Sequence, residues 1–599
     1  MANTLPKRQD VEQKYTWDLT HLYNSEAEYN QAFGEVFHGL DEFAEKYKGQ
    51  LTNVDTVVEA IKAYSDLSGK LSNLGQYSSL PVSTDVTDQL ALERSRTFGQ
   101  KAAQTSAKFA FFDGEISALD NAALDEVAEK APDYAAYIRR IKKNKPHLLS
   151  QEAEAVLSEV NPLLNSQLDT YETTKLADMK FPDFVVNGET YSLSYQLYED
   201  YYAFHPDKDV RRSAFEAFSN VLKDYKNTNA SLYYTEVLKD KTMANLRGYD
   251  SVFDYLLADQ EIDREWYDRQ IDGITTYLAP VMQKYAKLLK EENNLNEITY
   301  ADLKMDLDPE YELNLTIEEA RSDVKDALDI LGEDYVDMID KFYDERWVDF
   351  VRNEGKQTGG FCSASYGKHP YILMTWNNKL SDAYTLIHEL GHAGQGILAN
   401  RNNPALASNP SMYIIEAPST FHELLLTENL KRKVGEDDPR KERFVLTNMI
   451  ANTYFHNYVT HLLEAAYQRE VYRLIDDGKS FGAEELSAIK RQILEDFWGE
   501  DVIINEGAEL TWMRQPHYYM GLYPYTYSAS LTVSTQAFLK MQEDPEEYVP
   551  RWLEFLTLGD SKTPAEQAKV AGVDITTDQP LRDTIAFLDQ TVDRMIELS

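Results

Sequence analysis

Helical hydrophobic periodicity runs through most of this chain and restricts the folds that are open to it. Apolar residues recur at steps of three and four with charged residues between them, as in segments 54–71, 149–168 and 209–222. That spacing is typical of helices that bury one stripe of side chains. No apolar run approaches the roughly 20 residues needed to cross a bilayer. The sequence therefore predicts a mainly α-helical globular protein.

Two short segments break the helical pattern and predict β-hairpins. The first, residues 181–193, holds Asn187 and Gly188 between short apolar runs, which is a strong signal for a tight hairpin turn. Shortly after it, Pro206 favours a break before the next helical stretch. We therefore expect an N-terminal helical lobe over residues 1–204 and a second domain over residues 205–599.

The second hairpin is predicted for residues 359–376. Two segments rich in small or strand-forming residues flank the turn residues 367–370. Gly359 and Gly360 weaken a strand unless another backbone approaches it closely, so one interpretation is a substrate-binding edge. An ordinary bend at the edge of a sheet explains the two glycines equally well.

The charge and the cysteine content exclude several classes of protein. The 599 residues include 60 Lys and Arg and 101 Asp and Glu, which gives a formal net charge of −41. This negative field opposes binding to nucleic acid, and no basic amphipathic segment favours an anionic membrane. The single cysteine, Cys362, has no partner for an internal disulfide, and the first residues lack the apolar stretch of a secretion signal. These features predict a cytoplasmic protein.

One short motif carries recognisable chemistry. His388 and His392 lie four residues apart in a predicted helix that Ser381 or Asp382 can cap. The spacing puts both imidazoles on one helix face, where they provide half of a zinc site. Glu389, next to the first histidine, is placed to act on a water that the metal activates. With 11 histidines in the chain, such a pattern arises by chance in roughly one or two sequences in a hundred.

A third metal ligand is available downstream. Glu416 stands at the start of a second predicted helix, whose Pro418 suits a first turn. If the two helices pack together, Glu416 completes a set of three protein ligands, the number that a catalytic zinc uses. Glu423, two turns further along the same face, is better placed to hold a ligand imidazole. The competing interpretation, two histidines with purely structural roles and no metal, is weakened by this third ligand.

These residues resemble the motifs of a known family. The segments His388-Glu-Leu-Gly-His392, Glu416-Ala-Pro-Ser and His369-Pro-Tyr-Ile-Leu look like those of the thimet oligopeptidase-type (M3) zinc metallopeptidases, and more closely their bacterial oligoendopeptidase F branch. The resemblance covers nearly the whole chain. It implies a mainly helical, two-lobed body with a deep substrate channel and a small β-sheet beside the zinc-binding helix.

The resemblance also implies the roles of individual residues. One Zn²⁺ per chain would be held by His388, His392 and Glu416, with Glu389 as the general base of the catalytic domain, residues 205–599. The family often carries a further histidine where this chain has Gln395. That departure leaves the set of three ligands unaffected.

The C-terminal part adds candidates for stabilising the oxyanion. Residues 516–528 contain His517 and several tyrosines, including Tyr525 and Tyr527. A tyrosine hydroxyl or a protonated histidine can donate to a developing oxyanion opposite the metal. The resembled family has a Tyr- and His-rich loop with this role, and its alignment favours Tyr525, then His517, with Tyr527 as a weaker candidate that contacts substrate. Because the chain holds 40 tyrosines, most of them must be ordinary core or surface residues.

Two other histidines and the cysteine gain no catalytic role from the sequence. His456 and His461 lie in one predicted helix at a spacing of five, which does not stack them on one face. We therefore expect structural roles for both. Cys362 has no neighbouring base in the sequence that marks it as a nucleophile.

The motif and the resemblance together predict a zinc-dependent endopeptidase. We expect its binding partners to be short oligopeptide substrates. It would hydrolyse their internal bonds by metal-activated water, with Glu389 as general base. Extended substrate is expected to pair with the strand near Gly360. Two alternatives stay open here. One is a zinc exopeptidase of another His-Glu-x-x-His class, which needs a charged anchor that the sequence does not display. The other is a non-enzymatic acidic helical scaffold.

Overall fold

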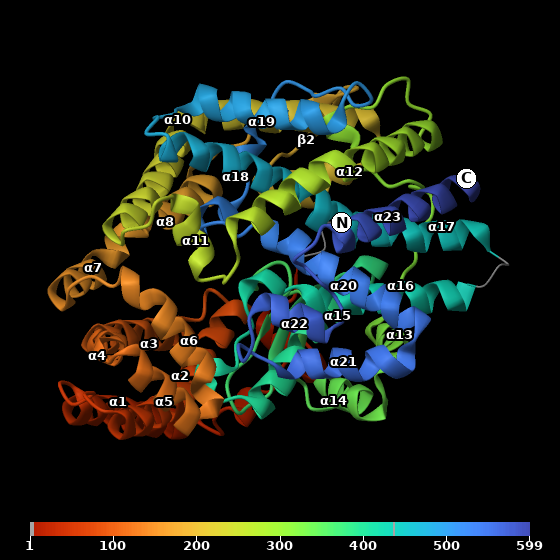
Figure 1. Ribbon diagram of the computed structural model, residues 1–599. Coiled ribbons are helices and arrows are strands. Elements are labelled where there is room, and N and C mark those ends of the chain that lie inside the picture. The colour runs from red at the N-terminus through yellow and green to blue at the C-terminus, as the bar shows by residue number, and fades with distance from the viewer. Residues whose placement is uncertain (1–4, 435–437) are drawn as a thin grey trace. The chain divides into compact units, whose positions relative to one another are not determined.

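The computed structural model describes residues 5–434 and 438–599, and the first four residues of the predicted N-terminal lobe lie outside these ranges. The described chain is mainly α-helical with two small sheets (Figure 1). The predicted fold class is therefore confirmed. Two compact units, each built from three separate segments, divide the chain: unit 1 comprises Met1–Val160, Leu313–Asn429 and Ala537–Val573, and unit 2 comprises Asn161–Glu312, Leu430–Gln536 and Asp574–Ser599. The predicted domain boundary near residue 204 stays a prediction.

Unit 1 consists of helices around one three-stranded sheet. A cluster of buried apolar side chains between Phe43 and Ile141 forms the core of its first segment. The predicted helix over residues 54–71 is confirmed and extends to Thr84. The helices of unit 1 are α1 (Glu26–Tyr47), α2 (Val54–Thr84), α3 (Gln89–Lys108), α4 (Phe111–Ala118), α5 (Asn121–Lys130), α6 (Ala135–Asn144), α7 (Gln151–Leu164), α13 (Ile317–Leu328), α14 (Glu333–Asp344), α15 (Leu380–Asn402), α16 (Ala417–Val434), α21 (Pro545–Thr557) and α22 (Pro564–Val570).

The sheet of unit 1 leads directly into the predicted zinc helix. Its strand order is β3 (Val348–Val351), β5 (Tyr371–Trp376) and β4 (Phe361–Ser363), with β4 antiparallel and β3 parallel to β5. The pair β4–β5 is the hairpin predicted for residues 359–376, which is thus confirmed. Strand β3 was not anticipated, because four residues carry too short a pattern to stand out. The central strand β5 is almost completely buried, and α15 follows it directly in the sequence.

Unit 2 contains the other predicted hairpin and the longest helix. Strands β1 (Phe184–Val186) and β2 (Glu189–Tyr191) pair in antiparallel fashion. Asn187 and Gly188 between them both have positive φ, at 52° and 87°, as the tight turn requires. The helices of unit 2 are α8 (Ser166–Thr173), α9 (Tyr195–Asp200), α10 (Lys208–Leu246), α11 (Val252–Ala258), α12 (Arg264–Glu292), α17 (Pro439–Asn448), α18 (His461–Asp476), α19 (Ala483–Trp498), α20 (Tyr525–Glu543) and α23 (Gln579–Glu597).

The other two predicted helical segments are confirmed with one interruption. The predicted helix 209–222 is part of α10. The pattern at 149–168 is divided instead between α7 and α8, with Asn165 between the two helices. Helices α7, α16 and α20 have residues in both units. None of the helices in the described ranges combines the length and the apolar character that crossing a bilayer requires.

A π-helical segment overturns one prediction about the histidines. Residues Met449–Thr460 (η12) form a π-helix that continues into α18. Its hydrogen bonds join residues five apart, so side chains at that spacing share a face. His456 and His461 accordingly meet, with their Nε2 atoms 3.0 Å apart. The prediction that a spacing of five keeps them on different faces was wrong, because it assumed α-helical geometry.

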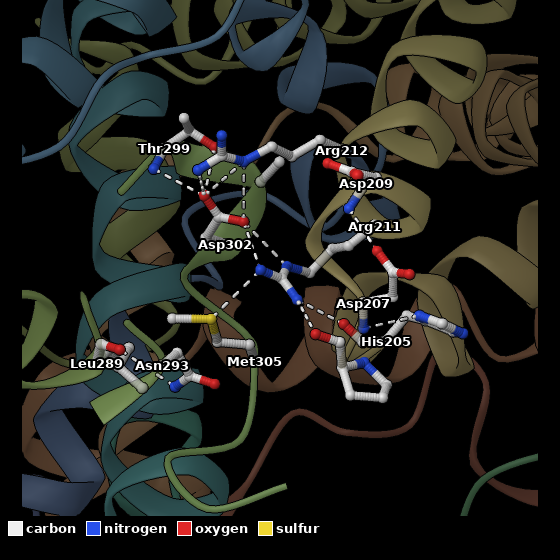
Figure 2. A network of polar contacts seen from close by, with 12 residues as sticks. His205, Asp207, Asp209, Arg211, Arg212, Leu289, Asn293, Thr299, Asp302 and Met305 are labelled. Atoms are coloured by element: carbon white, nitrogen blue, oxygen red, sulfur yellow. Dashed lines mark hydrogen bonds and ion pairs between the residues drawn. The ribbon is translucent and has the colours of Figure 1, made fainter. Parts of the chain in front are cut away.

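A buried ion network fixes the segment 299–305 against α10 (Figure 2). The fully buried carboxylate of Asp302 accepts hydrogen bonds from Arg211 Nη2 at 2.6 Å and from Arg212 Nη2 at 2.7 Å. It also accepts from the backbone N–H of Thr299 at 2.9 Å. Arg211 is itself only 1% exposed and donates to the carbonyl of His205 at 2.5 Å. Two guanidinium groups thus compensate one carboxylate, and the segment between Thr299 and Met305 is held in place.

We expect Asp302→Ala to destabilise unit 2 by about 3 to 5 kcal/mol, because Arg211 then stays buried without its carboxylate. Urea unfolding followed by circular dichroism measures the loss. Glu297→Ala is the matched control: Glu297 is the exposed partner of Arg212, 3.7 Å away, and its removal should change stability by less than about 0.5 kcal/mol. Equal stability of the two variants would contradict the role given to the network.

Candidate metal centre

Helix α15 carries both histidines of the motif. It begins at Leu380, and the Asp382 carboxylate accepts hydrogen bonds from the backbone N–H groups of Asn377 at 2.6 Å and Lys379 at 3.0 Å. Asp382 therefore caps the helix from its third position. The rings of His388 and His392 lie on one face with their centroids 5.0 Å apart.

A glycine between the histidines allows the next helix to approach. A Cβ atom at Gly391 would lie 2.5 Å from the carbonyl oxygen of Pro418 and 2.6 Å from the Cα of Ser419. No side chain fits in that space, so the first turn of α16 packs directly on the backbone of α15. Glu416, which immediately precedes α16, is thereby brought to the histidine face.

The three predicted ligands converge on one point. Glu416 Oε2 lies 3.3 Å from His388 Nε2 and 3.1 Å from His392 Nε2. Zinc bonds of 2.0–2.1 Å in a tetrahedron separate neighbouring ligand atoms by about 3.3 Å. These two distances fit a tetrahedral zinc ion, and the three donor atoms all lie within 4.8 Å of one another. Both histidine side chains keep about a fifth of their surface exposed, at 23% and 20%, which leaves one side of the group accessible.

Neighbouring side chains fix the orientation of these ligands. Glu423 Oε1 lies 2.6 Å from His388 Nδ1, the contact predicted for it, so that Nε2 is directed toward Glu416. Ser419 Oγ donates to Glu416 Oε2 at 2.9 Å. The buried His422 contacts the Ile387 carbonyl through Nδ1 at 3.2 Å and the Tyr335 hydroxyl through Nε2 at 3.0 Å. Ser419, His422 and Tyr335 were not predicted from the sequence, and only Ser419 belongs to a recognised motif.

The electrostatics of the group suit a cation and a base. Burial raises the pKa of Glu389 above its usual range, although the neighbouring histidines oppose that shift. Burial acts in the same direction on Glu416, but His392 and His388 hold its pKa well below the usual range. Burial lowers the pKa of His388, and hydrogen bonds to Glu416 and Glu423 more than reverse this, so that the net pKa is well above normal. Several carboxylates with two imidazoles form a donor set that a divalent cation prefers.

The glycine pair lies next to Glu389. A Cβ atom at Gly360 would lie 3.4 Å from Glu389 Oε1 and 2.8 Å from Thr385 Cγ2, whereas nothing approaches Gly359 within 4 Å. The closest approach to Gly360 is therefore made by side chains of α15, and the substrate-binding edge stays a prediction. Cys362, in the strand β4 that follows the glycines, is a thiol whose pKa burial raises well above its usual range, which makes it a poor nucleophile.

The candidates for the oxyanion lie in unit 2 and differ in their surroundings. Tyr525 is completely buried, and its hydroxyl donates to Gln260 Oε1 at 2.5 Å. His517 and Tyr527 are partly exposed. Tyr527 stacks on His461 with ring centroids 4.0 Å apart, and its hydroxyl accepts a hydrogen bond from Tyr523 at 3.2 Å.

A second group of metal-type ligands occurs in unit 2. Glu464 Oε2 lies 2.8 Å from His461 Nδ1 and 3.8 Å from His517 Nδ1, so three donor atoms are close together here as well. However, Glu464 also lies within the electrostatic reach of the ammonium groups of Lys304 and Lys490. These cations oppose a divalent ion, and we therefore assign the metal to the group on α15 and α16.

A helix that presents His-Glu-x-x-His beside a glutamate from the next helix defines a metal-dependent peptidase type of site. The comparisons agree with this class. The family model described as "Peptidase family M3" matches residues 201–587, and the one described as "Oligopeptidase F" matches residues 115–181. This chain belongs to peptidase family M3, and its enzymatic class is that of a metallo-oligopeptidase. The predicted resemblance is confirmed.

Individual relatives and solved structures are similar to this chain over nearly its full length. Oligopeptidase PepF of Bacillus subtilis (strain 168) is 28% identical over 602 residues, which cover 100% of this chain and 89% of the relative. A solved structure from Chlamydophila abortus has a TM-score of 0.85 at 20% identity and covers 100% of both chains. The crystal structure of oligoendopeptidase-F from Enterococcus faecium has a TM-score of 0.73 at 23% identity and covers 95% of this chain and 99% of its own. The two structures confirm the fold.

We expect Gly391→Ala to weaken zinc binding at least about tenfold, because the new methyl overlaps backbone atoms of α16 and moves Glu416 away from the histidines. Zinc content after dialysis against a graded series of chelator concentrations measures the change. Gly396→Ala on the same helix is the control, since its Cβ meets only the side chains of Ala364 at 3.2 Å and Pro370 at 3.6 Å. Unchanged zinc affinity in Gly391→Ala would show that the close packing is not what positions Glu416.

Proposed function

We propose that this protein is a zinc-dependent endopeptidase that hydrolyses internal bonds of short oligopeptides. The observation that carries the proposal is the convergence of the donor atoms of His388, His392 and Glu416 on one point directly beside Glu389. Membership of an oligopeptidase family supports peptides as substrates. We also propose that the catalytic domain spans residues 205–599, in keeping with the family match at 201–587, and that the protein is cytoplasmic.

His388, His392 and Glu416 would hold the ion, and Glu423 would orient His388 through Nδ1. When bound, zinc supplies a Lewis acid that polarises the scissile carbonyl. The ionised carboxylate that such a site needs is favoured by the two histidines, which hold the pKa of Glu416 well below its usual range. Zinc rather than another divalent ion is proposed because two histidines and one carboxylate form a common ligand set for it.

Glu389 is the proposed general base. Its carboxylate accepts a proton from the attacking water and delivers it to the leaving amine nitrogen. Burial, which raises the pKa of Glu389, makes the carboxylate a stronger proton acceptor than an exposed one. The backbone near Gly360 lies close to the same carboxylate, so an extended substrate paired with β4 would run past the base.

The proposed function is tested with a peptide that is acetylated at its N-terminus and amidated at its C-terminus. Cleavage of an internal bond by zinc-loaded protein, detected by mass spectrometry, is the expected result. An exopeptidase would release nothing from this substrate, and a non-enzymatic scaffold would not retain stoichiometric zinc on purification. Either outcome would overturn the proposal.

We expect Glu389→Gln to keep its zinc and to lose turnover by roughly a thousandfold or more, because an amide cannot accept the proton. The variant preserves the size of the side chain, and Glu389 is not one of the three ligands. Metal analysis and kcat are measured on the same preparation. Activity equal to that of the parent at equal zinc content would remove Glu389 from the mechanism.

Oxyanion stabilisation is the proposed role of Tyr525, followed by His517, with Tyr527 as a substrate contact. If Tyr525 donates to the oxyanion, Tyr525→Phe should lower kcat by roughly a hundredfold with little change in KM. Since the Tyr525 hydroxyl donates to Gln260, unfolding of the variant must be measured alongside kcat to separate catalysis from stability. Tyr527→Phe should be milder. A larger loss of kcat in Tyr527→Phe or His517→Ala would transfer the role to that residue.

A further inference from the structure

Unit 2 contains a cavity whose wall includes three basic side chains. Its volume is about 70 Å³, several times what one water molecule occupies on this measure. The wall includes the ammonium groups of Lys304 and Lys490 and the guanidinium of Arg514, together with aromatic side chains such as Tyr198, Tyr300 and Trp498. The chain as a whole is strongly acidic, so a concentration of cations in one cavity calls for an explanation.

Lys490 is buried without a strong partner. Its side chain is only 3% exposed, and its Nζ donates one long hydrogen bond, to the carbonyl of Leu463 at 3.4 Å. Lys304 retains exposed surface, and its Nζ lies 5.8 Å from the ring centroid of Phe204. In the described part of the chain, no carboxylate oxygen lies within 4.0 Å of either ammonium group. Desolvation lowers the pKa of both lysines to about 8, which leaves them mostly charged at neutral pH.

The nearby carboxylates already have partners. Glu199 accepts hydrogen bonds from Arg514 at 2.9 and 3.1 Å. Glu464, which also lines the cavity, accepts from His461, and the pKa of its carboxyl is held far below the usual range despite burial. Neither group neutralises the two lysines by direct contact. A buried cation without a direct partner is costly, and the surroundings are arranged to receive an anion from outside.

The position of Lys304 is fixed independently of any ligand. Lys304 lies between Asp302 and Met305, in the segment that the Arg211–Asp302–Arg212 network holds (Figure 2). Lys490 is carried by α19 and Arg514 follows the 3₁₀ helix η13 (Ala508–Met513). Three separate segments therefore present cations to one preformed cavity, as expected of a binding site.

We propose that this cavity binds the C-terminal carboxylate of a peptide whose last side chain is apolar or aromatic. The carboxylate would accept hydrogen bonds from the two ammonium groups, while Leu303, Leu463 and Trp498 in the wall cover the side chain. A bare phosphate matches the cations but leaves this apolar wall uncovered. Peptide as the ligand rests on the proposed function, whereas the anion site itself does not.

This site supplies a feature that the sequence did not display. A charged anchor for a peptide terminus was expected only of an exopeptidase, and no motif indicated one. Lys304, Lys490 and Arg514 are far apart in the chain, so only the fold brings them together. An anchor for the terminal carboxylate strengthens binding of free peptides without excluding amidated ones, and an internal bond can still be cut in either.

The test measures binding rather than turnover. Zinc-loaded Glu389→Gln protein is titrated calorimetrically with two peptides of one sequence ending in phenylalanine, one a free acid and the other an amide. We expect the free acid to bind at least about tenfold more tightly. Lys490→Met and Lys304→Met, each in the same background, should abolish most of this preference. Lys479→Met, at an exposed lysine of unit 2 paired with Asp477, should keep it.

The variants also control for zinc and for folding. A carboxylate that bound to zinc instead would keep its preference in both cavity variants, which would overturn the proposal. Methionine at position 490 replaces a buried cation by an apolar chain of similar length, so Lys490→Met should unfold no more readily than the parent. Circular dichroism checks this before titration.

Further ligands separate the possible sources of the anion. N-acetyl-phenylalanine alone should bind weakly, with the same dependence on Lys490. Tight binding of inorganic phosphate with no preference for the free-acid peptide would overturn the peptide assignment. Equal binding of acid and amide, together with no binding of phosphate, would overturn the anion site as a whole. Failure of the proposed enzymatic function appears separately, as absence of zinc or of cleavage by the parent, and leaves these binding measurements interpretable.

Discussion

The direct contact between the backbones of α15 and α16 determines the chemistry of unit 1. Gly391 lacks the side chain that would separate the two helices, and the position of Glu416 beside the histidines follows from that contact. It sets the distance from Glu416 to both histidines and brings Glu423 to His388. Two local sequence patterns, which end and begin 24 residues apart at His392 and Glu416, thereby become one site.

The parts of this site that the sequence predicted are those that depend on local geometry. The histidine spacing is a property of one helix, and Glu416 and Glu423 belong to a single further helix start. The supporting contacts of Tyr335 and His422 depend on α14 packing beside both helices, and no spacing rule contains that information. Ser419 belongs to a recognised motif, so the sequence draws attention to it. Its hydrogen bond to Glu416, however, could be seen only in the structure.

Unit 2 shows the opposite case, in which tertiary structure overrides a local rule. An α-helical pattern separates His456 from His461, but the π-helix brings their Nε2 atoms within hydrogen-bonding distance. The cationic cavity is equally invisible in the sequence, since each of its lysines looks like an ordinary surface residue where it stands. The hairpin at Asn187–Gly188 was predictable for the converse reason, because its turn is decided by two adjacent residues.

The interleaving of the two units has a consequence for how the chain matures during synthesis. The first segment of unit 1 has a hydrophobic core of its own, formed by residues between Phe43 and Ile141. This core can form as soon as the segment has left the ribosome. A nascent chain that ends just after Glu423 already carries every residue of the metal group. It still lacks α21, whose Trp552 stacks on Phe421 of α16 at 4.0 Å between ring centroids. The packing that holds α16 in place is thus completed only late in synthesis, when α21 emerges near the end of the chain.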